Sequence, residues 1–475
     1  MISQTTGVAR PLVIGVVMAL CLQLSVNCVC AETWYVNNRD GNDANDGLRE
    51  QSAFRTIARA VKSAKRSDSL SLANTGKVYR EALVLIHQGG TPAKPMIIEG
   101  NGAVISGLRT IEAGSWEKQG DVYVKVGKYP YGWPMLVIND KRIPPADRED
   151  LQPGQWSWVR AKGKNNQGLL RFRPEVGKSI EDYHIEGSFE VSGVRVVSSS
   201  YLVIRNLVTE FHSNDGFNVH GDCRSTVFEN IEARFNGDDG FSIHEAVEAV
   251  VRNGHFHHNG SGIEDVNLSR SFYSGIRVHD NSRLGILFIG AFHSAVDARV
   301  YDNPSNFRIT PGVTKHLLGG EFSPIQGTSV YLQNVISHGG DAGVVITKRA
   351  RVMIVNSVFA GSKTGIAAGE GSRLHLTKSV VAHCADWELR LKGESFFGDA
   401  NVYFPGRFEF GGKKYTPQQW EDFKKAAGHH HFAVKQDPAL DSHFRIGEPA
   451  LKQLGQHVIG PTIYYTYDDD DEEEP

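Results

Sequence analysis

The chain has 475 residues, of which 40% are hydrophobic and 50 are glycine, against only 18 prolines. This composition allows a sizeable core with many tight turns, and it argues against a protein built from long helices. The 51 basic and 54 acidic residues give a formal net charge of −3. The chain therefore lacks the basic excess of a nucleic-acid-binding protein, and we expect no nucleic-acid partner.

Residues 1–31 have the pattern of a secretory signal peptide. Arg10 precedes the apolar run PLVIGVVMALCLQL, and the stretch ends in Val29-Cys30-Ala31. This pattern predicts cleavage near Glu32, and no later run is long enough to span a bilayer. We therefore expect a secreted protein, periplasmic or extracellular, that is a monomer without stable membrane insertion after signal cleavage. A lipid anchor on Cys28 or Cys30 is a weaker alternative.

The segments that follow hold the first coils of a repeat and a separate module. Residues 32–108 contain a polar, glycine-rich loop, an amphipathic helix predicted at about 54–64, and several strands. We expect this helix to cover an open end of the fold and its unpaired backbone edge. Residues 109–190 break the periodicity and predict an inserted β-rich module. Its aromatic residues form the core of the module or, alternatively, stack on sugar rings; they include Trp116, Trp133, Trp156 and Trp158.

Between residues 191 and 395, short stretches of alternating apolar and polar residues recur every 21 to 24 residues. The steps fall at Asn206, Asn230, Asn253, Ser274 and Ala298 and, after an irregular stretch, at Asn334, Asn356 and Lys378. A fixed period of this length indicates a solenoid, and the period-two alternation indicates strands. Leucine-rich repeats share the period, but these segments lack their dense leucine signature. We predict an all-β fold, a right-handed parallel β-helix whose coils are stable only when stacked.

The N-terminal motif YVNNRDGNDANDG, followed by AFRTIARAV, resembles that of secreted pectate-lyase-like β-helix proteins. The segment that begins KYTPQQWEDF also resembles the end of such proteins, and we expect residues 396–465 to form the C-terminal cap. Residues 466–475 contain DDDDEEE and predict a disordered, solvated tail. The resemblance implies a β-helix that acts on an extracellular polysaccharide.

Two successive coils carry similar acidic turns, SNDGFNVHG at 213–221 and NGDDGFSIHE at 236–245. Because neighbouring coils lie about 4.8 Å apart, residues in register stack on one another. This register stacks Asp215 on Asp239, Asn218 on Ser242 and His220 on His244; Asp238 lies beside the aspartates, and Glu264 follows one coil later. We expect a cluster of carboxylates and imidazoles on one exposed face. Asparagine and aspartate also suit such turns without any function.

Two reactions suit this cluster, and we expect the first, a calcium-assisted β-elimination by a polysaccharide lyase. The first resembles the reaction of family-9 pectate lyases. In this chain Asp215, Asp238 and Asp239 would bind Ca²⁺, and a uronate would be cleaved by β-elimination. This chain has Glu264 where that family has a catalytic lysine, so Arg283, about 10 Å further along the stack, is our candidate base.

In the second reaction, paired aspartates such as Asp239 act as general acid and base of a glycoside hydrolase, as in the similar polygalacturonases. His244 is a further catalytic candidate for either reaction. The candidates for substrate binding are His220, Asn218, Ser242 and Glu264. A non-catalytic glycan-binding or structural β-helix is the third alternative, because the fold itself determines no reaction.

Histidine runs and cysteines make weaker candidates for metal and disulfide chemistry. In HFHH at 255–258, alternation points His255 and His257 one way and His258 the other, and HHH at 429–431 lies in a predicted loop. Cys223 and Cys384 are separated by about 35 Å of stacked coils, whereas a disulfide needs Cα atoms within about 7 Å. We expect both thiols to be unpaired.

Overall fold

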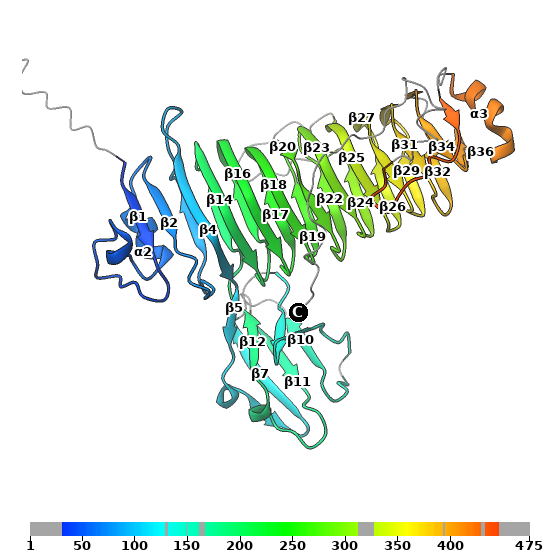
Figure 1. Ribbon diagram of the computed structural model, residues 1–475. Coiled ribbons are helices and arrows are strands. Elements are labelled where there is room, and N and C mark those ends of the chain that lie inside the picture. The colour runs from blue at the N-terminus through cyan, green and yellow to red at the C-terminus, as the bar shows by residue number, and fades with distance from the viewer. Residues whose placement is uncertain are drawn as a thin grey trace, which may run out of the picture.

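The computed structural model describes residues 31–128, 132–148, 150–160, 167–311, 327–392, 395–428 and 433–445. Most of these residues form a stack of coils, with a smaller module hanging from one side (Figure 1). Within this described part, the strands of the coils form one 17-stranded and one 12-stranded sheet, and they pair almost entirely in parallel. The predicted parallel β-helix is therefore confirmed.

Each central coil combines a long, bent strand of the larger sheet with a short strand of the smaller sheet. The long strands are β14 (Leu202–Glu210), β16 (Asp222–Arg234), β18 (Ala246–His257), the pair β20 (Arg270–Ser274) and β21 (Arg277–His279), and β23 (Phe292–Tyr301). The short strands are β13 (Val194–Val197), β15 (Phe217–His220), β17 (Asp239–Ile243), β19 (Ser261–Asp265), β22 (Leu284–Phe288) and β24 (Ser305–Ile309).

The stack extends in both directions from these coils. On the N-terminal side lie β1 (Thr33–Val36), β2 (Ser69–Leu72), β3 (Leu83–Ile86) and β4 (Met96–Ser106). On the C-terminal side the larger sheet adds β25 (Ser329–His338), β27 (Arg351–Val355), β28 (Val358–Ala360), β30 (Arg373–Thr377), β31 (Val380–Ala382), β33 (Phe396–Asp399), β34 (Val402–Phe404) and β37 (Val434–Lys435). The smaller sheet adds β26 (Ala342–Ile346), β29 (Thr364–Ala368), β32 (Trp387–Leu391), β35 (Phe408–Phe410) and β36 (Lys413–Tyr415).

The core is built from residues that repeat in register from coil to coil. Phe217 pairs with Phe241, which pairs with Ile263, and none of the three side chains is exposed to solvent. Rings from different strands of a coil then meet inside, and the Phe241 ring lies 4.9 Å from that of Phe228. Burial of such apolar side chains between coils is what holds the stack together. Cys223 and Cys384 are buried and unpaired, as expected.

The recurring asparagines mark a bend in each coil. Asn206, Asn230 and Asn253 have positive φ angles of 55°, 51° and 53°. Asparagine tolerates this left-handed conformation better than most residues. Their amides also form a ladder, in which Asn230 donates to Asn206 over 3.0 Å and Asn253 donates to Asn230 over 3.1 Å. Asparagine therefore recurs in the sequence because each coil needs a residue that tolerates a left-handed backbone conformation at its bend.

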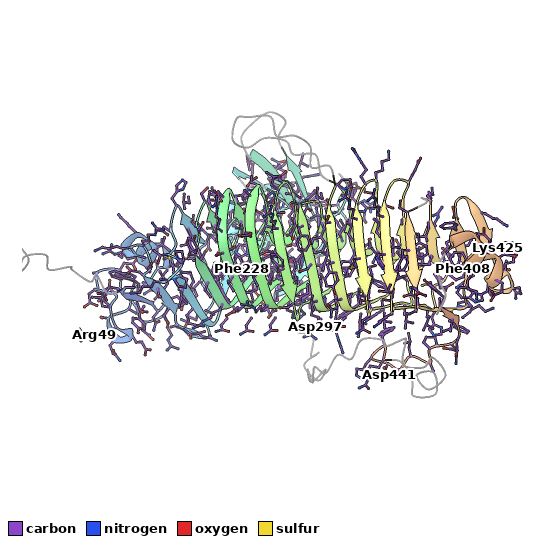
Figure 2. All side chains as sticks on the ribbon, turned by 90° about the horizontal axis from the view of Figure 1, so that it is seen from above. Arg49, Phe228, Asp297, Phe408, Lys425 and Asp441 are labelled. Carbon is purple, nitrogen blue, oxygen red and sulfur yellow. The ribbon has the colours of Figure 1, made fainter. Side chains whose placement is uncertain are left out.

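Helices close both ends of the stack. Near the N-terminal end, α2 (Ile57–Ser63) lies inside the range predicted for the cap helix, and the Thr56 side chain accepts a hydrogen bond from the first turn. At the C-terminal end, Phe423 of α3 (Trp420–Ala427) stacks on Phe408, with ring centroids 4.0 Å apart. Figure 2 shows Arg49 and Lys425 at opposite ends of the molecule. Within the described residues, no helix is long and apolar enough to cross a bilayer.

The module between β4 and β13 consists of two small antiparallel sheets with their own core. One contains β6 (Glu117–Gln119), β7 (Val122–Lys128), β10 (Trp156–Arg160) and β11 (Gln167–Phe172); the other contains β5 (Leu108–Thr110), β8 (Leu136–Ile138), β9 (Lys141–Ile143) and β12 (Ile185–Ser188). Trp116 and Trp156 are buried in this core, and Trp158 packs against it. Trp133, in contrast, is 59% exposed. Of these four tryptophans, Trp133 is the one whose ring is exposed enough to meet a sugar.

Candidate functional site

The two acidic turns lie in register, one coil above the other. Gly216 N donates to Asp239 O over 2.9 Å, and Asp239 N donates to the Asp215 carboxylate over 3.2 Å. Asp215 also accepts hydrogen bonds from the Asn214 and Asn218 side-chain amides. Asp215 is therefore a structural acceptor for the next coil as well as a member of the acidic cluster.

A second asparagine ladder, buried beside these turns, fixes their geometry. Asn236 donates to Asn259 over 2.9 Å, Asn259 donates to Asn281 over 3.2 Å, and Asn281 donates to Asn303 over 2.9 Å. Asn236, Asn259, Asn281 and Asn303 are all at most 1% exposed. Buried amides that satisfy one another in this way hold a turn rigidly. The signal in the sequence is an asparagine shortly before each short strand, but this ladder was not predicted.

The acidic cluster consists of Asp215, Asp238 and Asp239, and one carboxylate oxygen of each lies within 4.8 Å of the other two. The prediction of an exposed face is wrong for Asp215 and Asp239, and also for Asn218 and Ser242, because all four are buried. A Cβ atom on Gly240 would meet the core residue Phe256, so the Asp239 side chain points away from the core and is buried beside Arg283. Asp238 remains partly exposed.

Burial changes the protonation of the cluster. Desolvation, reinforced by the charge of Asp238, raises the pKa of Asp215 to about 7. Desolvation and the charge of Glu264 raise the pKa of Asp239 well above its ordinary value. Glu264 pairs in register with Ser242, and its own pKa is raised by burial and by Asp238. Neighbouring carboxyl groups that cannot all ionise are typical of acid–base sites.

Arg283 enters the cluster from the coil two steps further along, as the sequence predicted. Its guanidinium donates to Asp238, lies 3.5 Å from Asp239 Oδ1, and donates to Ser261 Oγ over 3.4 Å. Burial lowers the pKa of Arg283, but the hydrogen bond and the negative charge of Asp238 outweigh burial, so the pKa is raised overall. Arg283 thus serves as an internal counter-charge beside Asp238 and Asp239.

The predicted pair of imidazoles is present further along the same strands. The rings of His220 and His244 stack with centroids 4.1 Å apart, and His244 Nε2 lies 2.8 Å from Ser242 Oγ. His220 Nδ1 lies 3.2 Å from an oxygen of Glu245, which was not among the predicted site residues. Burial and the neighbouring His220 lower the pKa of His244 to about 4. His244 is therefore neutral at physiological pH, and in the tautomer with an unprotonated Nε2 it accepts a hydrogen bond from the Ser242 hydroxyl.

The inserted module touches the coils at the acidic turns. Trp133 N donates to Ser213 O over 2.5 Å, and a Cβ atom built on Gly237 would lie 3.0 Å from that of Trp133. The exposed Trp133 ring is therefore attached beside the turn that carries Asp238. Tryptophan rings bind the apolar faces of sugars well. The sequence could not predict this contact, because it depends on how the module between β4 and β13 folds back onto the coils.

The residues of the acidic cluster also fit a hard divalent cation. Three carboxylates converge, and Asp239 Oδ1 is buried without a hydrogen-bond donor among the described residues. Carboxylate oxygens are the preferred ligands of Ca²⁺. Asp215, Asp238 and Asp239 would hold such an ion only if Arg283 moved away from Asp238.

We expect Asp215 to make stability depend on pH. In the folded protein the Asp215 carboxyl group has a pKa of about 7, whereas in the unfolded chain its pKa is near 3.8. Between these values the folded state binds more protons, so the contribution of Asp215 to stability decreases as pH rises. The thermal unfolding temperature, measured across this pH range, should decrease more steeply with rising pH for wild type than for Asp215→Asn. An exposed control, Asp222→Asn, should follow wild type; equal slopes for all three proteins would contradict the assignment.

Comparison with known proteins agrees with this architecture. Residues 192–308 match a family model described as a right handed beta helix region. A solved structure of XylC in complex with xylose superposes with a TM-score of 0.50 at 12% identity, over 86% of this chain and 87% of that chain. A glycoside hydrolase gives a TM-score of 0.48 at 9% identity, over 89% and 100%. A rhamnogalacturonan lyase gives 0.29 at 10% identity, over 78% and 73%.

No curated protein matches the sequence. The identities to solved structures are too low to transfer an activity, and the similarity establishes the fold alone. The chain is a right-handed parallel β-helix protein, as its sequence predicted.

Proposed function

We propose that the protein is a secreted enzyme that cleaves an extracellular polysaccharide at the acidic cluster, and that the reaction is hydrolysis. The observation that carries this proposal is the pairing of unlike carboxyl groups within 4.8 Å of one another. Asp239 is buried with a raised pKa, whereas Asp238 is partly exposed and bonded to Arg283. Asp239 therefore suits the role of proton donor, and Asp238 suits the role of base.

In this reaction Asp239 transfers its proton to the glycosidic oxygen while the bond from that oxygen to the anomeric carbon breaks. Asp238 takes a proton from the attacking water, whose oxygen forms the new bond to the anomeric carbon. Proton exchange through solvent then restores both groups. In this proposal Trp133 would stack on a sugar unit next to the cleaved bond, and Asn218, Ser242 and Glu264 would bind the substrate from the adjoining register positions.

Calcium-assisted β-elimination is the second candidate, in line with the resemblance to pectate lyases. It is favoured by the three converging carboxylates and by the buried Asp239 oxygen that lacks a donor among the described residues. Arg283 would then have to act as the base, and its raised pKa opposes the loss of its proton. This is why we place hydrolysis first.

Product analysis separates these reactions. The purified protein would be incubated with polygalacturonate, alginate and xylan, with added Ca²⁺ and with a chelator. We expect new reducing ends without ultraviolet-absorbing products, in both conditions. Unsaturated, ultraviolet-absorbing ends that disappear with the chelator would establish the lyase instead. Glycan binding without any product would refute both reactions and leave a binding protein.

A further inference from the structure

Three histidines converge on the outer face of the larger sheet, on strands other than those of the acidic cluster. His255 and His257 lie two residues apart in β18, on the same face, and β21 places His279 directly beside His257 in the next coil. Phe256, between His255 and His257, and its register partner Val278 belong to the buried core, so the histidines lie on the opposite face. One ring nitrogen of each histidine lies within 4.8 Å of those of the other two, and His255 Nε2 lies 2.7 Å from His279 Nε2.

Carboxylates orient two of the three rings. His279 Nδ1 lies 2.7 Å from Asp280 Oδ2, and His257 Nε2 lies 3.2 Å from Glu232 Oε1. An ionised carboxylate only accepts hydrogen bonds, so His279 must carry its proton on Nδ1 when it is neutral. The Nε2 lone pair of His279 then points at His255. A carboxylate on one ring nitrogen and a metal ion on the other is the usual arrangement of a coordinating histidine. The second nitrogen of His257, Nδ1, lies 2.7 Å from His258 Nδ1, so His257 would exchange this contact for the ion.

The three rings also stack on one another, and the centroids of His255 and His257 are 4.2 Å apart. The rings of His257 and His279 stack with centroids 5.1 Å apart, and Tyr301 stacks on His279 at 4.7 Å. Stacking uses the faces of the rings, whereas the contact between His255 and His279 is made by ring edges, which carry the lone pairs.

We propose that His255, His257 and His279 bind one divalent transition-metal ion of the Zn²⁺ class. Three imidazoles select zinc, copper or nickel over Ca²⁺, which prefers oxygen ligands. Tetrahedral coordination would place two ligand nitrogens roughly 3.3 Å apart, so the His255 and His279 rings need to separate only slightly. A groove of about 560 Å³ is lined by Glu232 and His255 among others, so solvent reaches the edge of the cluster at His255. This site is independent of the proposed hydrolysis.

A zinc titration tests the proposal on the full mature chain, with a chromophoric chelator as competitor. We expect one Zn²⁺ per chain for wild type, and loss of this binding in the triple variant His255→Ala, His257→Ala, His279→Ala. Asp280→Asn leaves all three ligands in place and should weaken binding by about 10- to 100-fold. Circular dichroism of each variant reports whether the fold is retained.

The chain offers a matched control in its other histidine run. The variant His429→Ala, His430→Ala, His431→Ala removes three adjacent imidazoles that lie outside the described residues, and it should bind zinc as wild type does. If this control loses the zinc, or if the His255/His257/His279 triple variant keeps it, the proposal is wrong. Co²⁺ provides a second readout: the visible spectrum of a tetrahedral nitrogen site should appear in wild type and be absent from the triple variant. A triple variant with the same Co²⁺ spectrum as wild type would also refute the assignment.

Discussion

Replacing Asp239 by asparagine should reduce the rate of polysaccharide cleavage by about 10³-fold, because general acid–base catalysis contributes roughly 10²- to 10⁴-fold. Asparagine keeps the size of the side chain but cannot donate a carboxylic proton. The side chain is buried and its pKa is raised, so the wild-type group keeps its proton to a higher pH than an exposed aspartate does. The measurement is kcat from the initial release of reducing ends on the best substrate of the glycan panel.

Asp222→Asn is the matched control for this experiment. Asp222 is exposed, pairs with Arg224 and lies at the other end of the smaller-sheet strands. We expect it to leave kcat unchanged. An Asp239→Asn enzyme that is folded, as judged by its thermal unfolding, and as active as wild type would exclude Asp239 as the proton donor. The loss of a buried ionisable group should not destabilise the fold, because an amide avoids the cost of burying charge.

The core variant Phe241→Ala should lower the free energy of unfolding by about 3 to 5 kcal/mol. Phe241 has no exposed surface, and its ring contacts those of Phe228 and Phe256 at centroid distances of 4.9 and 5.8 Å. Alanine would leave a cavity where three coils meet. Because each coil depends on its neighbours, the cost should appear as one shift of the whole transition rather than as local melting.

Urea denaturation followed by circular dichroism measures this cost. Phe272→Ala is the matched control, because Phe272 lies in β20 of the same stack but is 42% exposed. We expect its midpoint to shift far less than that of Phe241→Ala. Equal shifts for both variants would mean that the inward positions do not carry the stability of the stack.

Much of the architecture was predictable because a β-helix repeats one local pattern. The recurring asparagine marks a left-handed bend, and the alternation on either side of it identifies the inward positions. Together they place Phe217 on Phe241 and His220 on His244, both of which the structure shows. The level of each residue in the stack follows from counting along the chain, because parallel strands pair in register.

The candidate site was predictable in position but not in electrostatics. Counting brought Asp215, Asp239 and Arg283 to neighbouring levels, and the structure brings them together. Counting could not show that Asp215 and Asp239 are buried, and burial is the main cause that raises the pKa of both carboxyl groups. Solvation depends on what covers a side chain, and that cover comes from other coils and from the turn itself.

The amino-acid sequence by itself determined the coil period, the bends, the inward residues and the order in which the coils stack. Only the tertiary structure decided that Arg283 is bonded to Asp238, that Trp133 of the module reaches the acidic turn, and that His279 joins His255 and His257. The physical reason is the separation along the chain over which each interaction acts. Backbone preference and strand alternation act between residues close in the chain, whereas solvent exclusion and side-chain direction are set by contacts between residues that lie far apart in it.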